Sequence, residues 1–107
     1  MRKEIEEFLD SLQEVKGYSQ NTIVAYRNDL RQFASHFRSN DDINGITKEQ
    51  LENYVYGLKG DREYASATVA RKVAAIKSFY HFLLSKGAVT HDPSAELETP
   101  HVRKSLP

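Results

Sequence analysis

The stretch that decides the fold is Ser66-Ala-Thr-Val-Ala-Arg-Lys-Val-Ala-Ala-Ile-Lys-Ser-Phe-Tyr-His-Phe-Leu-Leu-Ser-Lys86, which Gly87 follows. Its apolar side chains recur every three or four residues, which is the period of one face of an α-helix. These positions are Val69, Val73, Ile76, Tyr80 and Leu83. The spacing predicts a long helix over residues 66–86. We expect it to end at Gly87, because glycine readily adopts the left-handed conformation that ends many helices.

Three earlier segments show the same period. The first covers residues 2–15 and is followed by Gly17, and the second begins after the cap candidate Ser19 and ends near residue 37. The third opens with Thr47-Lys-Glu-Gln50, a capping box, and ends near Gly57 and Gly60. Their apolar positions are Ile5, Phe8, Leu9, Leu12 and Val15 in the first, Ile23, Tyr26, Leu30, Phe33 and Phe37 in the second, and Leu51, Tyr54, Val55 and Leu58 in the third.

Polar segments separate these helices. Residues 38–45 and residues 61–63 predict loops. Near the end of the chain, Asp92-Pro93 predicts the cap and first residue of a short turn that runs through residue 97. Residues 98–107 contain two prolines and no apolar period, so they predict a linker.

The whole pattern predicts an all-α fold. The alternation typical of strands is absent, and no Asn-Gly or Asp-Gly pair joins two β-rich runs. The chain has 107 residues, which suits one domain with one hydrophobic core. We therefore expect a compact bundle of four main helices plus a short C-terminal helical turn, as one domain over residues 1–97.

Composition excludes several classes of protein. The sequence has no cysteine, which excludes disulfides and thiolate metal sites and suits the reducing cytosol. Its start is too acidic for a signal peptide, and no apolar run approaches the ~18 residues of a membrane span. The histidines His36, His81, His91 and His101 lack metal-ligand spacing. We expect a cytoplasmic protein with no metal, cofactor, membrane contact or small-molecule substrate.

Charge is balanced in total but uneven along the chain. Fifteen basic residues face fifteen acidic ones, and the zero net charge is unusual for a protein that binds nucleic acid. The second and fourth helices, however, hold only one acidic residue, Asp29. Their basic residues are Arg27, Arg31, Arg38, Arg71, Lys72, Lys77 and Lys86. The positive charge is therefore expected on two helices.

The face of the last helix opposite its apolar stripe carries mostly small residues around an arginine. We expect it to be formed by Ala67, Arg71, Ala74 and Ser78, with Thr68 and Ala75 to one side. Small residues let another surface approach closely, whereas a solvated face more often carries paired Glu and Lys. A solvated basic face remains the alternative. Phe82 is also expected to point outward, toward a second packing partner.

Hydroxyl and amide side chains gather where the second and fourth helices begin. Ser19, Asn21 and Thr22 stand at one start, and Ser66 and Thr68 at the other. The N–H groups at a helix start attract phosphate, and hydroxyls beside them add donors. Simple capping is the other explanation, and we expect it to account for one residue at each start.

A weak internal repeat relates the two helices. A shift of 46 residues places Tyr18, Thr22 and Phe33 on Tyr64, Thr68 and Phe79. The match indicates either two helices with similar starts or two related helical hairpins packed together.

Two ordered blocks of sequence resemble a known family. Tyr18-Ser-Gln-Asn-Thr-Ile-Val-Ala-Tyr-Arg-Asn-Asp-Leu-Arg-Gln-Phe33 and the first eighteen residues of the 66–86 stretch resemble the opening helices of tyrosine recombinases and phage integrases. The tail, with Asp92-Pro-Ser-Ala-Glu-Leu97, Thr99-Pro100 and Leu106-Pro107, resembles the family's passage toward its catalytic domain. The resemblance covers essentially the whole chain and is closest to Xer-type chromosome-dimer resolvases.

The resemblance implies a SAM-like core-binding domain that clamps a DNA duplex together with a catalytic domain. Its second and fourth helices would lie against the major groove, with Ser19, Asn21, Thr22 and Thr68 on phosphates. Lys77 stands where many relatives have arginine, and lysine cannot make a bidentate contact with guanine. When the arginines of the second helix and the two helix starts are included, the candidate DNA-binding residues are Ser19, Gln20, Asn21, Thr22, Arg27, Arg31, Ser66, Thr68, Arg71, Lys72 and Lys77.

The same resemblance implies that this chain does not cut DNA by itself. The family's nucleophilic tyrosine and its supporting arginines, lysine and histidines belong to the second domain, and this sequence is expected to stop at the linker before it. Of the six tyrosines, Tyr26, Tyr54 and Tyr80 are expected in the core, Tyr18 and Tyr64 at helix entries, and Tyr56 at the surface.

The expected partners are double-stranded DNA and other recombinase protomers on paired sites. The main alternative is a SAM-like protein–protein interaction module, which the zero net charge and the acidic first helix favour. A third possibility is a structural fragment with no activity alone.

Overall fold

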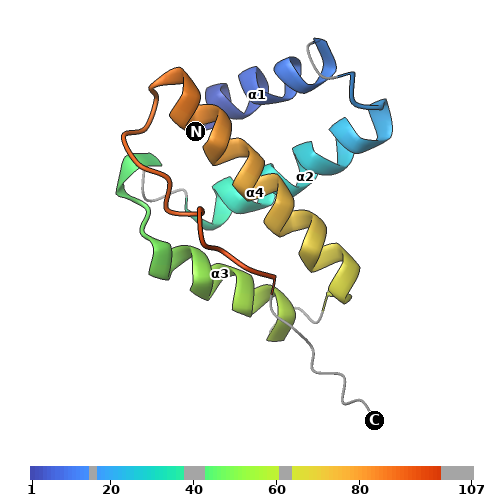
Figure 1. Ribbon diagram of the computed structural model, residues 1–107. Coiled ribbons are helices and arrows are strands. Elements are labelled where there is room, and N and C mark those ends of the chain that lie inside the picture. Colours follow the sequence, from blue (N-terminus) through green and yellow to red (C-terminus); the bar gives the residue numbers. More distant parts are fainter. Residues whose placement is uncertain (15–16, 38–42, 61–63, 100–107) are drawn as a thin grey trace.

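The computed structural model of the chain describes residues 1–14, 17–37, 43–60 and 64–99, and four α-helices make up most of it (Figure 1). The elements are α1 (Arg2–Glu14), α2 (Gln20–His36), the short 3-10 helix η1 (Ile43–Gly45), α3 (Lys48–Gly60) and α4 (Ser66–Lys86). The described residues contain no strand. The predicted all-α bundle of four main helices is confirmed, and α4 has the predicted bounds.

Helix α4 is the central element, because it packs against α1, α2 and α3. In Figure 1 it crosses in front of α2, with α1 above and α3 below. The aromatic rings mark these contacts: Phe33 of α2 lies 5.5 Å from Tyr54 of α3 and 6.4 Å from Tyr80 of α4, between ring centroids. Phe8 of α1 lies 5.7 Å from Phe79 of α4. One hydrophobic core therefore joins all four helices.

The predicted caps form at two helix starts and one helix end. At α2, the Ser19 Oγ accepts a hydrogen bond from the backbone N–H of Thr22. At α3, Thr47 and Gln50 form the reciprocal capping box, with bonds of 2.8 and 3.1 Å. Gly87 ends α4 with φ +79°, a conformation that side chains disfavour.

The start of α4 differs from the expectation that a hydroxyl caps it. The cap residue is Ala65, which has no side chain able to accept a backbone hydrogen bond. The Ser66 Oγ instead accepts a hydrogen bond from Lys59 Nζ at 3.0 Å. This hydroxyl links the end of α3 to the start of α4 and does not cap either helix.

The buried arc of α4 is wider than its apolar stripe predicts. Ala75 was expected beside the outward face, but it is fully buried. Phe79 is also fully buried, and Lys72 is almost fully buried. Phe82, also expected to point outward, is half-buried and lies 5.5 Å from the ring of Phe8 on α1. A helix that packs against three other helices buries more of its surface than one apolar stripe. The apolar period of a single helix does not show how many helices will pack against it.

The segments between the helices are described in part. Within the predicted loop of residues 38–45, η1 forms and Ile43 is buried, followed by a fully buried Ile46. Val15, Lys16, residues 38–42 and residues 61–63 lie outside the described residues.

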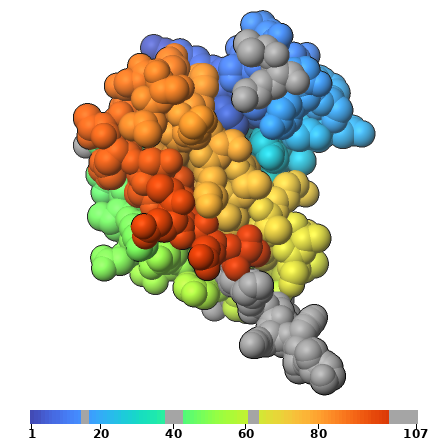
Figure 2. Space-filling model, viewed as in Figure 1, coloured from blue at the N-terminus to red at the C-terminus, as the bar shows by residue number. Residues whose placement is uncertain are grey.

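Residues 88–99, the C-terminal segment, fold back over the bundle. Asp92 accepts hydrogen bonds from the N–H and the Oγ of Ser94, so the predicted cap and turn form. Leu97 is buried at the end of this turn. Figure 2 shows the segment, in red, against α3 and α4. Residues 100–107, most of the predicted linker, lie outside the described residues.

Replacing Leu30 by alanine tests the position of α2 in the core. Leu30 is fully buried, so the cavity should lower the free energy of unfolding by about 2–5 kcal/mol. Val24→Ala on the same helix removes an exposed side chain and should change it by less than about 0.5 kcal/mol. Urea unfolding followed by circular dichroism measures both, and equal small effects would contradict the described packing.

Candidate nucleic-acid interface

A buried carboxylate joins α2 and α4, the two helices in which basic residues outnumber acidic ones. Asp29 of α2 has a side chain only 1% exposed. Arg71 of α4 donates to it through Nε at 2.8 Å and through Nη2 at 2.7 Å, and Lys72 Nζ donates to it at 2.9 Å. A buried charge is costly unless it is paired and hydrogen-bonded, and this one receives three charge-assisted bonds. The group therefore fixes how α2 and α4 meet.

Lys72 belongs to the interior of this network. Its Nζ also donates to the Gln32 side-chain oxygen at 2.7 Å and lies 4.8 Å from the centre of the Tyr64 ring. The Gln32 amide in turn donates to the Tyr64 hydroxyl at 3.1 Å. We expected Lys72 at the surface as a DNA contact, but its side chain is only 8% exposed. Its place in the network makes it a structural residue in this conformation.

Arg71 has one side in the network and one side at the surface. Its side chain is 43% exposed, and its residue lies on the outward part of α4, as predicted. The hydrogen bond with Asp29 raises the pKa of the guanidinium above its ordinary value, so the group stays charged at any physiological pH. Arg71 is therefore a fixed, partly exposed cation at the contact between α2 and α4.

The other arginines of α2 differ in how far α1 neutralises them. Arg27 binds the Glu6 carboxylate at 3.0 Å through Nη2, while Arg31 Nη2 lies 3.8 Å from the same carboxylate and its side chain is 61% exposed. The hydrogen bond from Arg27 lowers the pKa of Glu6 below its ordinary value, because it stabilises the charged carboxylate. Arg27 is thus largely offset, and Arg31 is the more accessible cation of α2.

The start of α2 presents polar groups to solvent. Ser19, Gln20 and Asn21 are exposed, and Thr22 is half-buried. Ser19 is occupied in part, because its Oγ caps the helix and lies 3.1 Å from the Thr22 hydroxyl. In Figure 1, α2 begins at the upper right of the view and α4 at the lower right. At the start of α4, Ser66 is exposed and Thr68 is half-buried.

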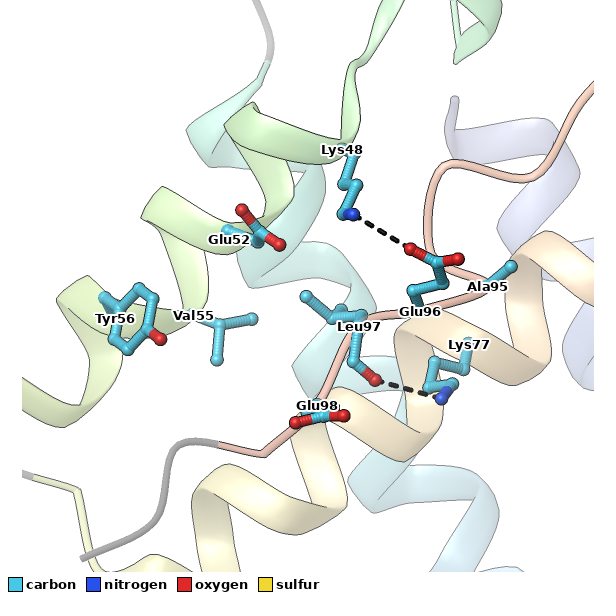
Figure 3. Close-up of a pocket in the computed structure, with 9 residues that line it drawn as sticks. All are labelled: Lys48, Glu52, Val55, Tyr56, Lys77, Ala95, Glu96, Leu97 and Glu98. Atoms are coloured by element: carbon cyan, nitrogen blue, oxygen red, sulfur yellow. Dashed lines mark hydrogen bonds and ion pairs between the residues drawn. The ribbon is translucent and has the colours of Figure 1, made fainter.

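Lys77 contacts the C-terminal segment. Its Nζ donates to the backbone oxygen of Leu97 at 2.9 Å, and Lys48 of α3 binds Glu96 at the same distance. Figure 3 shows both ammonium groups reaching this segment across a groove. The groove is lined by Lys48, Glu52, Val55, Tyr56, Lys77, Ala95, Glu96, Leu97 and Glu98. Lys77 was expected at the DNA and is instead engaged with the protein's own backbone here.

Sequence reasoning missed the residue that organises this surface. Asp29 entered the prediction only as the single acidic residue on two basic helices. That exception was the available signal, because it stands next to Leu30 and four residues before Phe33, both of which are in the core. An acidic residue at the edge of an apolar stripe, on a helix otherwise basic, indicates a buried partner for cations.

The remaining expectations concern the tyrosines, metal ligands and membrane spans. Tyr54 and Tyr80 are buried, Tyr26 and Tyr64 pack against the core, and Tyr56 is exposed, as predicted. In the part of the chain that the structure describes, no cluster of three or more histidine or acidic side chains is arranged to hold a metal. Across the same residues, no helix has the length and apolar character of a membrane span.

A bundle of four helices, with α2 packed directly on α4, is the class of domain that the sequence resemblance implied. The chain matches the family described as the phage integrase N-terminal SAM-like domain over residues 5–87. It belongs to this family.

Tyrosine recombinases of the Xer type are similar along the whole chain. The chain is 39% identical over 109 aligned residues to a tyrosine recombinase XerC of Roseiflexus sp. (strain RS-1), covering 100% of this chain and 34% of that protein. It is 35% identical over 106 residues to a tyrosine recombinase XerD of Listeria monocytogenes serotype 4b (strain F2365), covering 96% and 35%. The chain therefore spans about a third of the length of these relatives.

Replacing Lys72 by alanine tests whether this lysine is structural. The change leaves the buried Asp29 and the half-buried Gln32 each short of a donor, so it should lower the free energy of unfolding by about 1–3 kcal/mol. Lys3→Ala removes an exposed lysine from α1 and should change it by less than about 0.5 kcal/mol. Chemical unfolding of both variants measures these changes in the free energy of unfolding. If Lys72→Ala changes it as little as Lys3→Ala does, Lys72 lies at the surface.

Proposed function

We propose that this chain is the core-binding domain of a tyrosine site-specific recombinase and that α2 and α4 bind double-stranded DNA. The observation that carries the proposal is the direct packing of α2 on α4 around Asp29, which holds the exposed Arg71 at their contact. Family membership supports it, because the relatives matched along the whole chain are named as tyrosine recombinases.

The residues expected at DNA divide into two kinds. Arg31 and Arg71 offer exposed positive charge, which attracts the negatively charged phosphates of DNA and so contributes to affinity. The start of α2, with Gln20 and Asn21 exposed, offers backbone N–H groups and side-chain donors that fix position on the DNA backbone. Ser19, Thr22, Ser66 and Thr68 belong to this second, positioning kind.

Two further candidates contribute less in the conformation described. Arg27 shares its charge with Glu6, and Lys77 is bound to the Leu97 carbonyl. A phosphate would have to compete with these partners. We therefore rank Arg31 and Arg71 first for affinity and leave the buried Lys72 out of the contact set.

Cleavage of DNA would require the rest of the protein. The relatives are about three times as long as this chain, and residues 98–107 would lead toward the catalytic domain of such a protein. In that protein, the domain would act with other protomers on paired DNA sites, in integration or in the resolution of chromosome dimers. Such a protein would work in the cytoplasm.

A salt titration of Arg31→Ala tests this function. We expect the wild-type chain to bind a short fluorescein-labelled duplex weakly, with an affinity that falls as salt rises. Arg31→Ala should weaken binding and flatten the salt dependence by about one phosphate contact, as fluorescence anisotropy would report.

Lys3→Ala is the matched control, because it removes the same charge from an exposed position on α1. It should leave the salt dependence almost unchanged. Equal losses in the two variants would show diffuse attraction without a defined surface. An absence of saturable binding even at low salt would contradict the proposed function and favour a protein–protein interaction module.

A further inference from the structure

We propose that Asp29 is a positioning residue for DNA recognition, which orients Arg71 so that one particular edge of its guanidinium meets the duplex. Asp29 itself would not touch DNA, because its side chain is 1% exposed. It has this role only if the domain binds DNA as proposed above. The inference adds a specific requirement to that function: the contribution of Arg71 should depend on an acidic residue of a different helix.

The hydrogen bonds define which edge of Arg71 is left for a ligand. An arginine side chain has five N–H donors in a rigid planar fork. Asp29 takes one on Nε and one on Nη2, which together form one edge of the plane. Within the described part of the chain, Arg71 makes no other hydrogen bond or ion pair. The edge formed by Nη1 and the second N–H of Nη2 is therefore the one turned away from the carboxylate.

That remaining edge has the spacing for a pair of neighbouring acceptors. A guanine presents such a pair in the major groove through O6 and N7, and a phosphate presents one through two oxygens. Both ligands accept two parallel hydrogen bonds from the same planar fork. A lysine at this position would supply the charge without the fork.

Asp29 holds Arg71 in one orientation because Asp29 is itself held by other hydrogen bonds. Asp29 is held from a second side by the buried Lys72, and both cations belong to α4 while the carboxylate belongs to α2. A side chain that is already ordered loses less conformational entropy when it binds. Arg71 should thus contribute more to affinity with Asp29 in place than as a freely rotating arginine.

Simple electrostatics predicts the opposite effect of removing Asp29. A negative charge close to a DNA-binding surface opposes the approach of phosphates, so its loss alone should strengthen binding. Positioning predicts weaker binding. The sign of the change therefore separates the two accounts.

A double-mutant cycle measures that sign. Anisotropy titrations with a short mixed-sequence duplex would compare the wild-type chain, Arg71→Ala, Asp29→Asn and the double variant. We expect Arg71→Ala to weaken binding about tenfold. Asp29→Asn should weaken it about fivefold, and should add almost nothing in the Arg71→Ala background because the two residues act as a unit. Asp10→Asn on α1, an exposed acidic residue, should leave binding unchanged or slightly stronger.

Two variants keep the test decisive if Asp29→Asn unfolds by leaving Lys72 without a carboxylate. Asp29→Asn combined with Lys72→Met removes the buried cation together with its partner, and should show the same loss of affinity. Arg71→Lys keeps the charge and loses the fork, so it should weaken binding while the salt dependence stays nearly constant. We expect the NMR signal of the Arg71 Nε–H to be protected from exchange with water in the wild type, because this group donates to Asp29, and to lose that protection in Asp29→Asn.

A duplex built with 7-deazaguanine identifies which ligand the fork meets. It lacks the N7 acceptor and keeps every phosphate. If the Arg71→Ala effect shrinks on this duplex, the fork binds guanine, and if it persists, the fork binds phosphate.

The outcomes separate this inference from the proposed function. If the wild type binds and Arg71→Ala weakens binding, but Asp29→Asn leaves it unchanged or strengthens it, the positioning role is wrong and the proposed function stands. If Arg71→Ala itself has no effect, the positioning role is equally wrong. If the wild-type chain binds no duplex, the proposed function and the role of Asp29 fail together.

Discussion

A single buried carboxylate constrains the arrangement on which the proposed surface depends. Asp29 lies buried between α2 and α4, where Arg71 and Lys72 both donate hydrogen bonds to it, and those bonds have narrow geometry. They fix the rotation of α4 about its axis relative to α2. With that rotation set, Lys72 faces the interior and Arg71 faces outward on the neighbouring position of the helix. The polar network thus decides which cation a ligand can reach, while the aromatic core supplies the bulk of the packing.

Ion pairs between helices neutralise part of the basic charge locally. Glu6 and Glu7 of α1 bind Arg27 of α2 and Lys86 of α4, so α1 neutralises part of the basic charge that α2 and α4 carry. What remains accessible is a small set of cations with defined positions. A limited positive surface of this kind is consistent with the proposed function, in which the domain would bind DNA together with another part of a longer protein, since each contact adds modest, salt-sensitive affinity. The C-terminal segment, which begins directly after α4, is bound to the same helix through Lys77.

Most of the fold could be predicted from the sequence, because helical period and caps are local properties. The stripe that ends at Leu83 and the capping box at Thr47 needed no knowledge of distant residues. The candidate surface was harder to predict, because it depends on contacts between residues that are far apart in the sequence. Periodicity assigns Lys72 to a face of one helix but does not say that α2 covers that face. Composition counts Arg27 as a free positive charge, although Glu6, twenty-one residues earlier, offsets it. Such pairings depend on how the helices cross, which only the folded chain specifies.

The most direct test of the central claim is a map of amide chemical shifts during titration of the isotope-labelled chain with a short DNA duplex at low salt. If α2 and α4 form one DNA-binding surface around Asp29, the shifts should concentrate in residues 19–31 and 66–77 and shrink as salt is added. The Arg71 side-chain Nε–H signal should move with them. Shifts confined to α1 or to α3, or shifts absent from α4, would contradict the account.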